Sequence, residues 1–113
     1  DYQSNRDYPA LDTTYLSAHH KFGTISIRET YHTIKSKLGN DHPLIRQLYW
    51  RDFYTYVAYH SPYVYGNAYH QKYNSLHWRN NTNDFKAWCD GNTGFPIVDA
   101  GMRQLTTTGY MHN

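Results

Sequence analysis

Cysteine and net charge are both scarce in this 113-residue sequence. A single cysteine, Cys89, cannot form an internal disulfide, so a disulfide-stabilised fold is excluded. Eleven Lys and Arg oppose nine Asp and Glu, a formal charge of +2, which permits polyanion binding but lacks the dense basic stripe of many nucleic-acid binders. Apolar runs stay below the roughly 18 residues of a membrane span, and no signal peptide is visible, so we expect an intracellular protein with no membrane partner.

Common catalytic motifs are missing as well. The sequence has neither G-x-G-x-x-G nor G-x-x-x-x-G-K-[ST], the two familiar glycine-rich phosphate loops. Three acids lack a visible partner acid, so a hydrolytic carboxylate pair is not supported; they are Asp12, Asp52 and Asp99. His19 and His20 are adjacent, and adjacent side chains diverge on a helix, so we expect no metal site. Cys89 has no C-x-x-C partner and is expected to be a buried or half-buried small hydrophobe.

Aromatic side chains are abundant instead, with 13 Tyr and an aromatic fraction of 18%. Tyr has an apolar body and a polar tip, so it suits pockets and interfaces better than a dry core. Sustained strand alternation is absent and helical stripes recur, which predicts an all-α fold with helices near 26–38, 43–60, 83–89 and 97–108. Residues 1–16 read as irregular chain, and residues 61–80 read as a long loop with short turns.

Terminal signals support the first two helices. Ser26 and Glu29 fit a capping box, and Gly39 is a suitable stop. Asp41 is expected to cap the second helix, with Pro43 in its first turn. The first helix has an apolar stripe at helical spacing, formed by Ile27, Tyr31, Ile34 and Leu38. Both helices therefore have defined starts.

The second helix combines a predicted core face with large side chains outside it. The predicted core face consists of Ile45, Leu48, Tyr49, Phe53, Tyr56 and His60. Trp50, Arg51 and Tyr54 lie off this face. Aromatic planes suit a base or ring, and a guanidinium suits a phosphate, so the helix is a candidate nucleic-acid surface. The alternative, a helix buried in a larger assembly, remains open.

The last predicted helix begins near Pro96. Its expected buried stripe consists of Val98, Met102 and Leu105. Asp99 and Arg103 are spaced as an i, i+4 ion pair.

The stretch LDTTYLSAHHKFG places the hydroxyls of Thr13, Thr14 and Ser17 ahead of a helix. Hydroxyls and free main-chain N–H groups at a helix start suit a phosphate. An ordinary capped turn gives the same pattern, and on this stretch alone the capped turn is the better interpretation.

Taken in order, four segments resemble the flavin-binding domain of the DNA photolyase and cryptochrome family. YQSNRDYPA is similar to Y-x-x-x-R-D-x-P, and TTYLSAHHKFGTISIR is similar to T-S-R-L-S-P-x-L-K-F-G-x-I-S. LIRQLYWRDFY is similar to F-I-R-E-L-x-W-R-[DE]-F-Y, and TGFPIVDAGMRQLTTTGYMHN is nearly identical to the family's consensus sequence. The resemblance implies an incomplete domain over residues 1–113, without the α/β antenna domain and the C-terminal half of the FAD domain.

The resemblance also implies roles for individual residues. The FAD contacts would be Tyr2, Thr13, Thr14, Tyr15, Leu16 and Ser17. The damaged-DNA contacts would be Arg6, Gln47, Trp50, Arg51, Tyr54 and Asn113. Trp78 would be the outermost tryptophan of the electron relay. Tyr15 replaces the family's Arg, which removes a cation near the phosphates, and Gln47 stands where many cyclobutane-dimer photolyases carry Glu.

The implied activity is light-driven splitting of cyclobutane pyrimidine dimers in DNA by an electron from excited reduced FAD. The MHN ending favours this branch over the (6-4) branch. A cryptochrome photoreceptor and a non-catalytic vestigial fragment are the alternatives. The chain alone is expected to be inactive and to bind FAD weakly or not at all. Its oligomeric state is left open.

Overall fold

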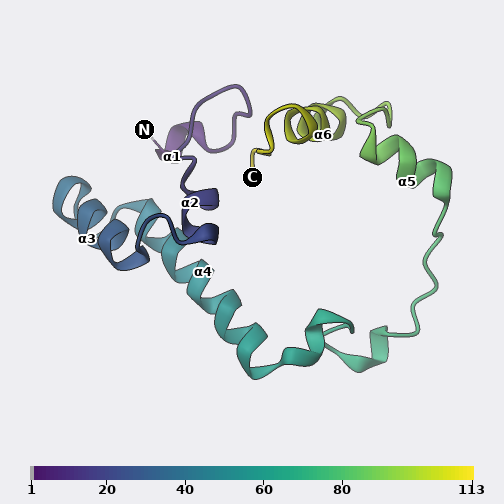
Figure 1. Ribbon diagram of the computed structural model, residues 1–113, viewed down its shortest axis with the longest axis horizontal. Helices are drawn as coiled ribbons and strands as arrows, with labels where there is room; N and C mark the ends of the chain where they lie inside the picture. Colours follow the sequence, from purple (N-terminus) through teal and green to yellow (C-terminus); the bar gives the residue numbers. More distant parts are fainter. Residues whose placement is uncertain (1) are drawn as a thin grey trace. The chain divides into compact units, whose positions relative to one another are not determined.

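The computed structural model describes residues 2–113, and helices are the only regular elements in that range (Figure 1). The chain forms two compact units that divide between Asn74 and Ser75. The first unit holds helices α1 (Tyr2–Asn5), α2 (Leu16–Phe22), α3 (Ile27–Leu38) and α4 (Pro43–His60), and the short 3₁₀ turns η1 (Pro62–Tyr65) and η2 (Gln71–Tyr73). The second unit holds α5 (Thr82–Cys89) and α6 (Pro96–Thr108). The all-α prediction is confirmed, and each of the four predicted helices is present within one residue of its expected bounds.

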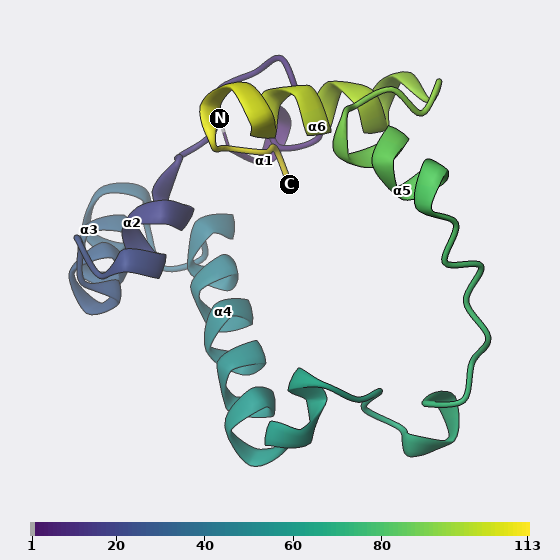
Figure 2. The same ribbon diagram turned by 45° about the vertical axis from the view of Figure 1, so that its right-hand side comes forward.

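The core of the first unit lies between α3 and the first turns of α4. Ile34 of α3 packs with Ile45 and Leu48 of α4, and Tyr31 and Leu44 cover this cluster. Burial of each large aliphatic side chain contributes about 1.5–3 kcal/mol, so the cluster is small but sufficient to join the two helices. The C-terminal turns of α4 extend away from α3 (Figure 2).

The long buried face predicted for α4 is wrong beyond Leu48. Phe53 is 51% exposed and Tyr56 is 66% exposed, although both lie on the predicted stripe. The reason is tertiary, because α3 covers the turns that contain Ile45 and Leu48 and diverges from the later turns. Most of α4 therefore presents aromatic side chains at the surface.

Two predicted helix caps also differ from the structure. Ser26 occupies the N-cap position of α3, but its side chain makes no capping hydrogen bond. His42, and not Asp41, caps α4, because its Nδ1 accepts a 3.3 Å hydrogen bond from the amide of Leu44. Pro43 opens α4 as predicted.

Of the segment predicted to be irregular, residue 1 lies outside the described residues, and residues 2–16 are more regular than the sequence suggested, because α1 occupies Tyr2–Asn5 and α2 begins at Leu16. Propensity is a poor guide to such short helices, which depend on tertiary contacts. The predicted loop at 61–80 is confirmed, with η1 and η2 as its short turns.

In the second unit, Asp99 and Arg103 do not form the predicted ion pair. The Asp99 carboxylate accepts hydrogen bonds from the amide and hydroxyl of Thr93, at 2.7 and 2.6 Å, and from the amide of Gly94 at 3.0 Å. The Arg103 Nε donates to the carbonyl of Gly91 at 3.0 Å. Both side chains therefore hold the turn between α5 and α6. In the expected apolar stripe only Met102 is fully buried, and Val98 and Leu105 are more than a third exposed.

Candidate functional site

The segment that precedes α2 makes a tight, hydroxyl-rich turn. Tyr15 occupies the left-handed region with φ 51°, and its hydroxyl donates a 2.7 Å hydrogen bond to Oδ1 of Asp12. Thr14 and Ser17 are exposed, whereas Thr13 and Leu16 are half-buried. Thr14 Oγ1 accepts a long 3.5 Å hydrogen bond from the Leu16 amide, and no side chain caps α2. The turn offers hydroxyls and main-chain N–H groups to a ligand, but residues 12–17 contain an aspartate and no cation.

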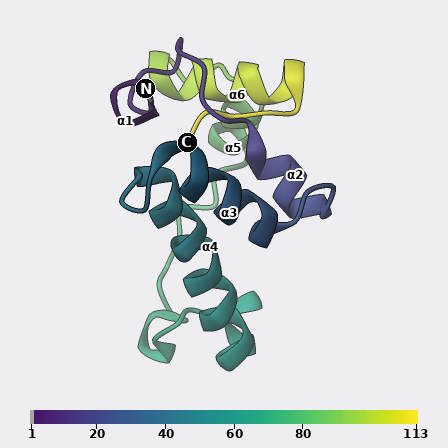
Figure 3. The ribbon, with the colours of Figure 1, turned by 90° about the vertical axis from the view of Figure 1, so that its left-hand side faces the viewer.

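Helices α2 and α3 lie beside each other in the first unit (Figure 3). A side-chain contact between His20 and Thr30 joins them. His20 Nε2 and Thr30 Oγ1 are 3.0 Å apart, and Thr30 is buried. Thr30 also donates its hydroxyl to the carbonyl of Ser26 at 3.1 Å. Burial, followed by the charge of Arg51 and by His19, lowers the pKa of His20. This contact was not predicted from the sequence. The one available signal was that His20 occupies a position where the resembled pattern has Leu.

One side of α4 carries four of the six predicted DNA residues. Gln47, Trp50, Arg51 and Tyr54 follow one another at intervals of three, one and three residues, which places them on adjacent turns of one side of the helix. The rings of Trp50 and Tyr54 stack with centroids 6.1 Å apart, and Phe53 contacts both edge to face. Arg51 Nη1 lies 3.2 Å from Oδ1 of Asp52, an exposed pair of little energetic weight.

Exposure alone does not distinguish Trp50. Its exposed fraction is 49%, close to that of Phe53 on the predicted core stripe. Trp50 directly precedes Arg51 and lies three residues after Gln47, so a guanidinium and an amide share its part of the helix. One side of the helix therefore carries a stacking plane, a cation and an amide donor and acceptor.

The predicted contacts on α1 belong to the same unit. Helix α1 contacts α4, with Tyr2 half-buried in α1. Arg6 follows α1 and is exposed, and its Nε lies 3.4 Å from Oδ1 of Asp7. Because both side chains are exposed, Arg6 can leave Asp7 and pair with a phosphate instead.

The second unit carries the two remaining predicted residues at separate places. Trp78 lies in the extended segment before α5 and is 67% exposed. Asn113 is exposed and follows α6, where the His112 amide donates to Oε1 of Gln104 at 2.8 Å. The structural role of Asp99 was not predicted from the sequence. It could have been found from its position, because an acid in the first turn of a helix can accept hydrogen bonds from the main chain that precedes the helix.

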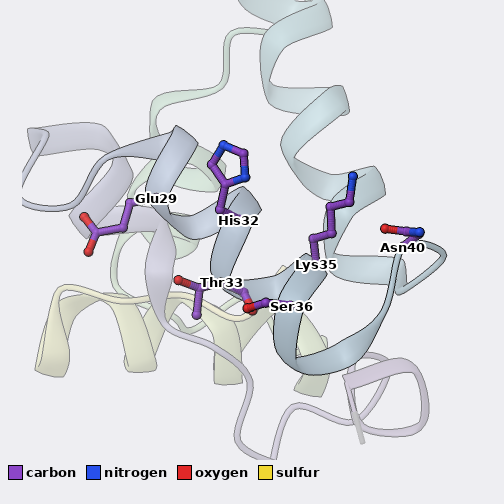
Figure 4. Close-up of a pocket in the computed structure, with 6 residues that line it drawn as sticks. All are labelled: Glu29, His32, Thr33, Lys35, Ser36 and Asn40. Carbon is purple, nitrogen blue, oxygen red and sulfur yellow. The ribbon is translucent and has the colours of Figure 1, made fainter.

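A shallow pocket on α3 lacks convergent chemistry. It is lined by Glu29, His32, Thr33, Lys35, Ser36 and Asn40. Figure 4 shows that the Glu29 carboxylate points away from the His32 ring and the Lys35 ammonium. No three acidic, histidine or cysteine side chains are grouped as a metal site in the described part of the chain. Within residues 2–113 no helix is both long enough and apolar enough to cross a membrane.

Comparison with known proteins resolves the family. The profile of the FAD binding domain of DNA photolyase matches residues 44–113, which include α5, α6 and all of α4 except Pro43. The chain belongs to this DNA photolyase family. It is 41% identical to a deoxyribodipyrimidine photo-lyase from Neurospora crassa, over 99% of this chain and 20% of that protein. It is also 41% identical to the deoxyribodipyrimidine photo-lyase of Halobacterium salinarum, over 99% of this chain and 25% of that protein.

A solved structure agrees with the photolyase assignment. The crystal structure of an archaeal photolyase from Sulfolobus tokodaii with two FAD molecules matches 100% of this chain and 26% of that protein, with a TM-score of 0.90 and 48% identity. FAD is therefore the cofactor of the domain type to which this chain belongs. The chain spans about a quarter of the length of these relatives.

Proposed function

We propose that this chain supplies part of a light-driven DNA repair flavoprotein, a deoxyribodipyrimidine photolyase that splits cyclobutane pyrimidine dimers. The observation that carries the proposal is the surface of α4, where Trp50, Arg51 and Gln47 lie together inside the segment that matches the FAD binding domain. Relatives that cover the whole chain bear the name of this enzyme, which supports the same reaction. Damaged DNA is the corresponding partner.

The residues of α4 and α1 would hold a dimer that has been flipped out of the duplex. Flipping costs a few kcal/mol, and stacking on an aromatic ring returns about 1–3 kcal/mol per base. In our proposal Trp50 and Tyr54 provide that stacking surface, and the Gln47 amide forms hydrogen bonds with a base edge. Arg51 and Arg6 pair with backbone phosphates. Asn113 adds a further amide contact to the substrate.

The turn before α2 would hold the FAD diphosphate. The exposed hydroxyls of Thr14 and Ser17 are suitable donors, while Thr13, Leu16 and Tyr15 shape the turn and Tyr2 adds a flavin contact. In this turn the diphosphate would be held by hydrogen bonds and not by a cation, because Tyr15 replaces the arginine of the family pattern. When bound, reduced FAD supplies the light-driven electron that opens the dimer and recovers it afterwards. Trp78, with its exposed indole, is the proposed entry point for electrons that reduce the flavin.

A photoreceptor of the cryptochrome type is the second candidate. Gln47 favours it, because Glu is the residue of many cyclobutane-dimer photolyases and Gln is common in other branches. Such a protein would use the same FAD turn without repairing DNA.

The two candidates separate in a segment-exchanged photolyase, in which this chain replaces the matching quarter of the Sulfolobus tokodaii enzyme. A photolyase-deficient bacterial strain that expresses it is irradiated with ultraviolet light and kept in visible light or darkness. Light-dependent survival supports repair. Retention of FAD without light-dependent survival supports the photoreceptor, and loss of FAD contradicts the proposed cofactor turn.

A further inference from the structure

Helix α2 depends on other elements for its position. It has only seven residues, none of them buried, and no side chain caps its start. A helix of this length is not stable in isolation. The turn at Thr13–Ser17 leads directly into α2, so any contact that fixes α2 also fixes the turn.

The contact between His20 and Thr30 meets this need. Thr30 donates its hydroxyl hydrogen to the Ser26 carbonyl, so its oxygen is left to accept from His20. His20 therefore donates from Nε2, which carries a proton both in this neutral tautomer and in the imidazolium, so any effect of ring charge comes from the surroundings and not from this bond. The chain of donors runs from α2 through the buried Thr30 to the N-cap residue of α3.

The surroundings of His20 oppose its protonation. The charges that lower the pKa of His20 are those of Arg51 on α4 and His19 on α2, and Arg51 is itself paired with Asp52 at 3.2 Å. From α3 the ring meets the hydroxyl of Thr30, which is uncharged. Protonation would therefore place a second cation beside Arg51 in a half-buried site, and the ring gains solvent and loses this repulsion when α2 leaves α3.

We propose that His20 is a positioning residue for the FAD turn: through Thr30 it fixes α2 on α3, and its protonation releases α2 and weakens FAD binding. The inference rests on the proposed function of the turn at Thr13–Ser17. Because the pKa of His20 is lowered from its ordinary value of 6.5 in the docked arrangement, docking is firmest above that value and weakens as the pH falls below it.

The first test measures FAD affinity of the segment-exchanged photolyase by flavin fluorescence at pH 7.5 and pH 5.5. The parent should bind more weakly at the lower pH. His20→Leu removes the donor and should weaken binding about two- to tenfold at pH 7.5, the range expected for one hydrogen bond. His20→Gln keeps an N–H donor without a titrating group, so it should retain the affinity of the parent at pH 7.5 and lose less of it at pH 5.5.

Thr30 provides the matched control. Thr30→Val removes the acceptor and should weaken binding as much as His20→Leu, whereas Thr30→Ser should not. The double variant His20→Leu/Thr30→Val should be no weaker than either single variant, because both remove one bond. Additive losses, or an unchanged pH profile in His20→Leu and His20→Gln, would overturn the proposal.

A second measurement needs no cofactor. Amide hydrogen exchange of residues 17–22 in the 113-residue chain should be faster in His20→Leu than in the parent, and equal in His20→Gln. Equal exchange in all three contradicts the positioning role of His20. If the segment-exchanged enzyme binds no FAD at either pH, the proposed function of the turn fails, and the exchange result alone decides the role of His20 in docking α2.

Discussion

The hydroxyl of Tyr15 donates a 2.7 Å hydrogen bond to the carboxylate of Asp12 at the entrance to α2. Tyr15 holds a left-handed φ of 51°, which costs a non-glycine residue roughly 1–2 kcal/mol. The photolyase pattern has an arginine at this position, so a phenol bound to an acid replaces a cation beside the proposed diphosphate. The pair should make this turn a weaker FAD site than that of a photolyase with the arginine.

Replacement of Tyr15 by Arg should therefore strengthen FAD binding, by about tenfold if the guanidinium makes one charged hydrogen bond to the diphosphate. Fluorescence titration of the segment-exchanged photolyase measures the change. Tyr15→Phe is the control, because it loses the hydroxyl and adds no cation. If the arginine variant binds FAD no better than the phenylalanine variant, the proposal that this turn holds the diphosphate is wrong.

Substitution of Trp50 by Ala should weaken binding to dimer-containing DNA by about 5- to 150-fold at fixed salt, because a base stack is worth roughly 1–3 kcal/mol. Binding to undamaged DNA should change much less, since it depends mainly on phosphate contacts. Electrophoretic or fluorescence-anisotropy titrations with both DNAs check this in the segment-exchanged enzyme.

Tyr59 supplies the matched control for Trp50, because it lies on the same helix, is 79% exposed and has no proposed role. Tyr59→Ala should leave both DNA affinities unchanged. Equal losses on damaged and undamaged DNA in Trp50→Ala would make Trp50 a structural residue. No loss on either DNA would place the dimer elsewhere.

Acid should loosen the turn between α5 and α6. The hydroxyl of Thr93, its amide and the amide of Gly94 lower the pKa of Asp99, and Arg103 adds to the effect. A carboxyl with a lowered pKa stabilises the folded state above its ordinary pKa, and this stability is lost as the pH falls through the lowered value. Amide protection factors at Thr93 and Gly94 should therefore decrease once the pH is lowered past about 4, the ordinary pKa of an aspartate.

Asp99→Asn separates charge from shape in this turn. The variant should show lower protection than the parent at neutral pH, and little further change in acid. A parent whose turn stays equally protected from pH 7 to pH 3 would show that the carboxylate charge does not hold it.

Local signals in the sequence predicted the helices well, and tertiary contacts set what they did not predict. The turn residues Pro43, Gly39 and Pro96 act on their own backbone, so the bounds of α3, α4 and α6 could be predicted. The exposure of Phe53 could not be predicted, because it depends on where α3 ends its contact with α4.

The candidate site shows the same division. Gln47, Trp50 and Arg51 could be grouped from helical spacing alone. The bond from His20 to Thr30 joins two helices across a turn, and the three hydrogen bonds to Asp99 close a turn of irregular backbone. Neither arrangement follows from residue spacing, which had suggested an Asp99–Arg103 pair.

The most direct test of the account is dimer splitting in vitro. The segment-exchanged photolyase is reduced, mixed with an oligonucleotide that contains one cyclobutane thymine dimer, and illuminated or kept dark, and the products are separated by chromatography. The account predicts restored thymines in the light, none in the dark, and a strong loss of yield in Trp50→Ala at subsaturating enzyme. An enzyme that retains FAD and binds the dimer but restores no thymine in the light would contradict it.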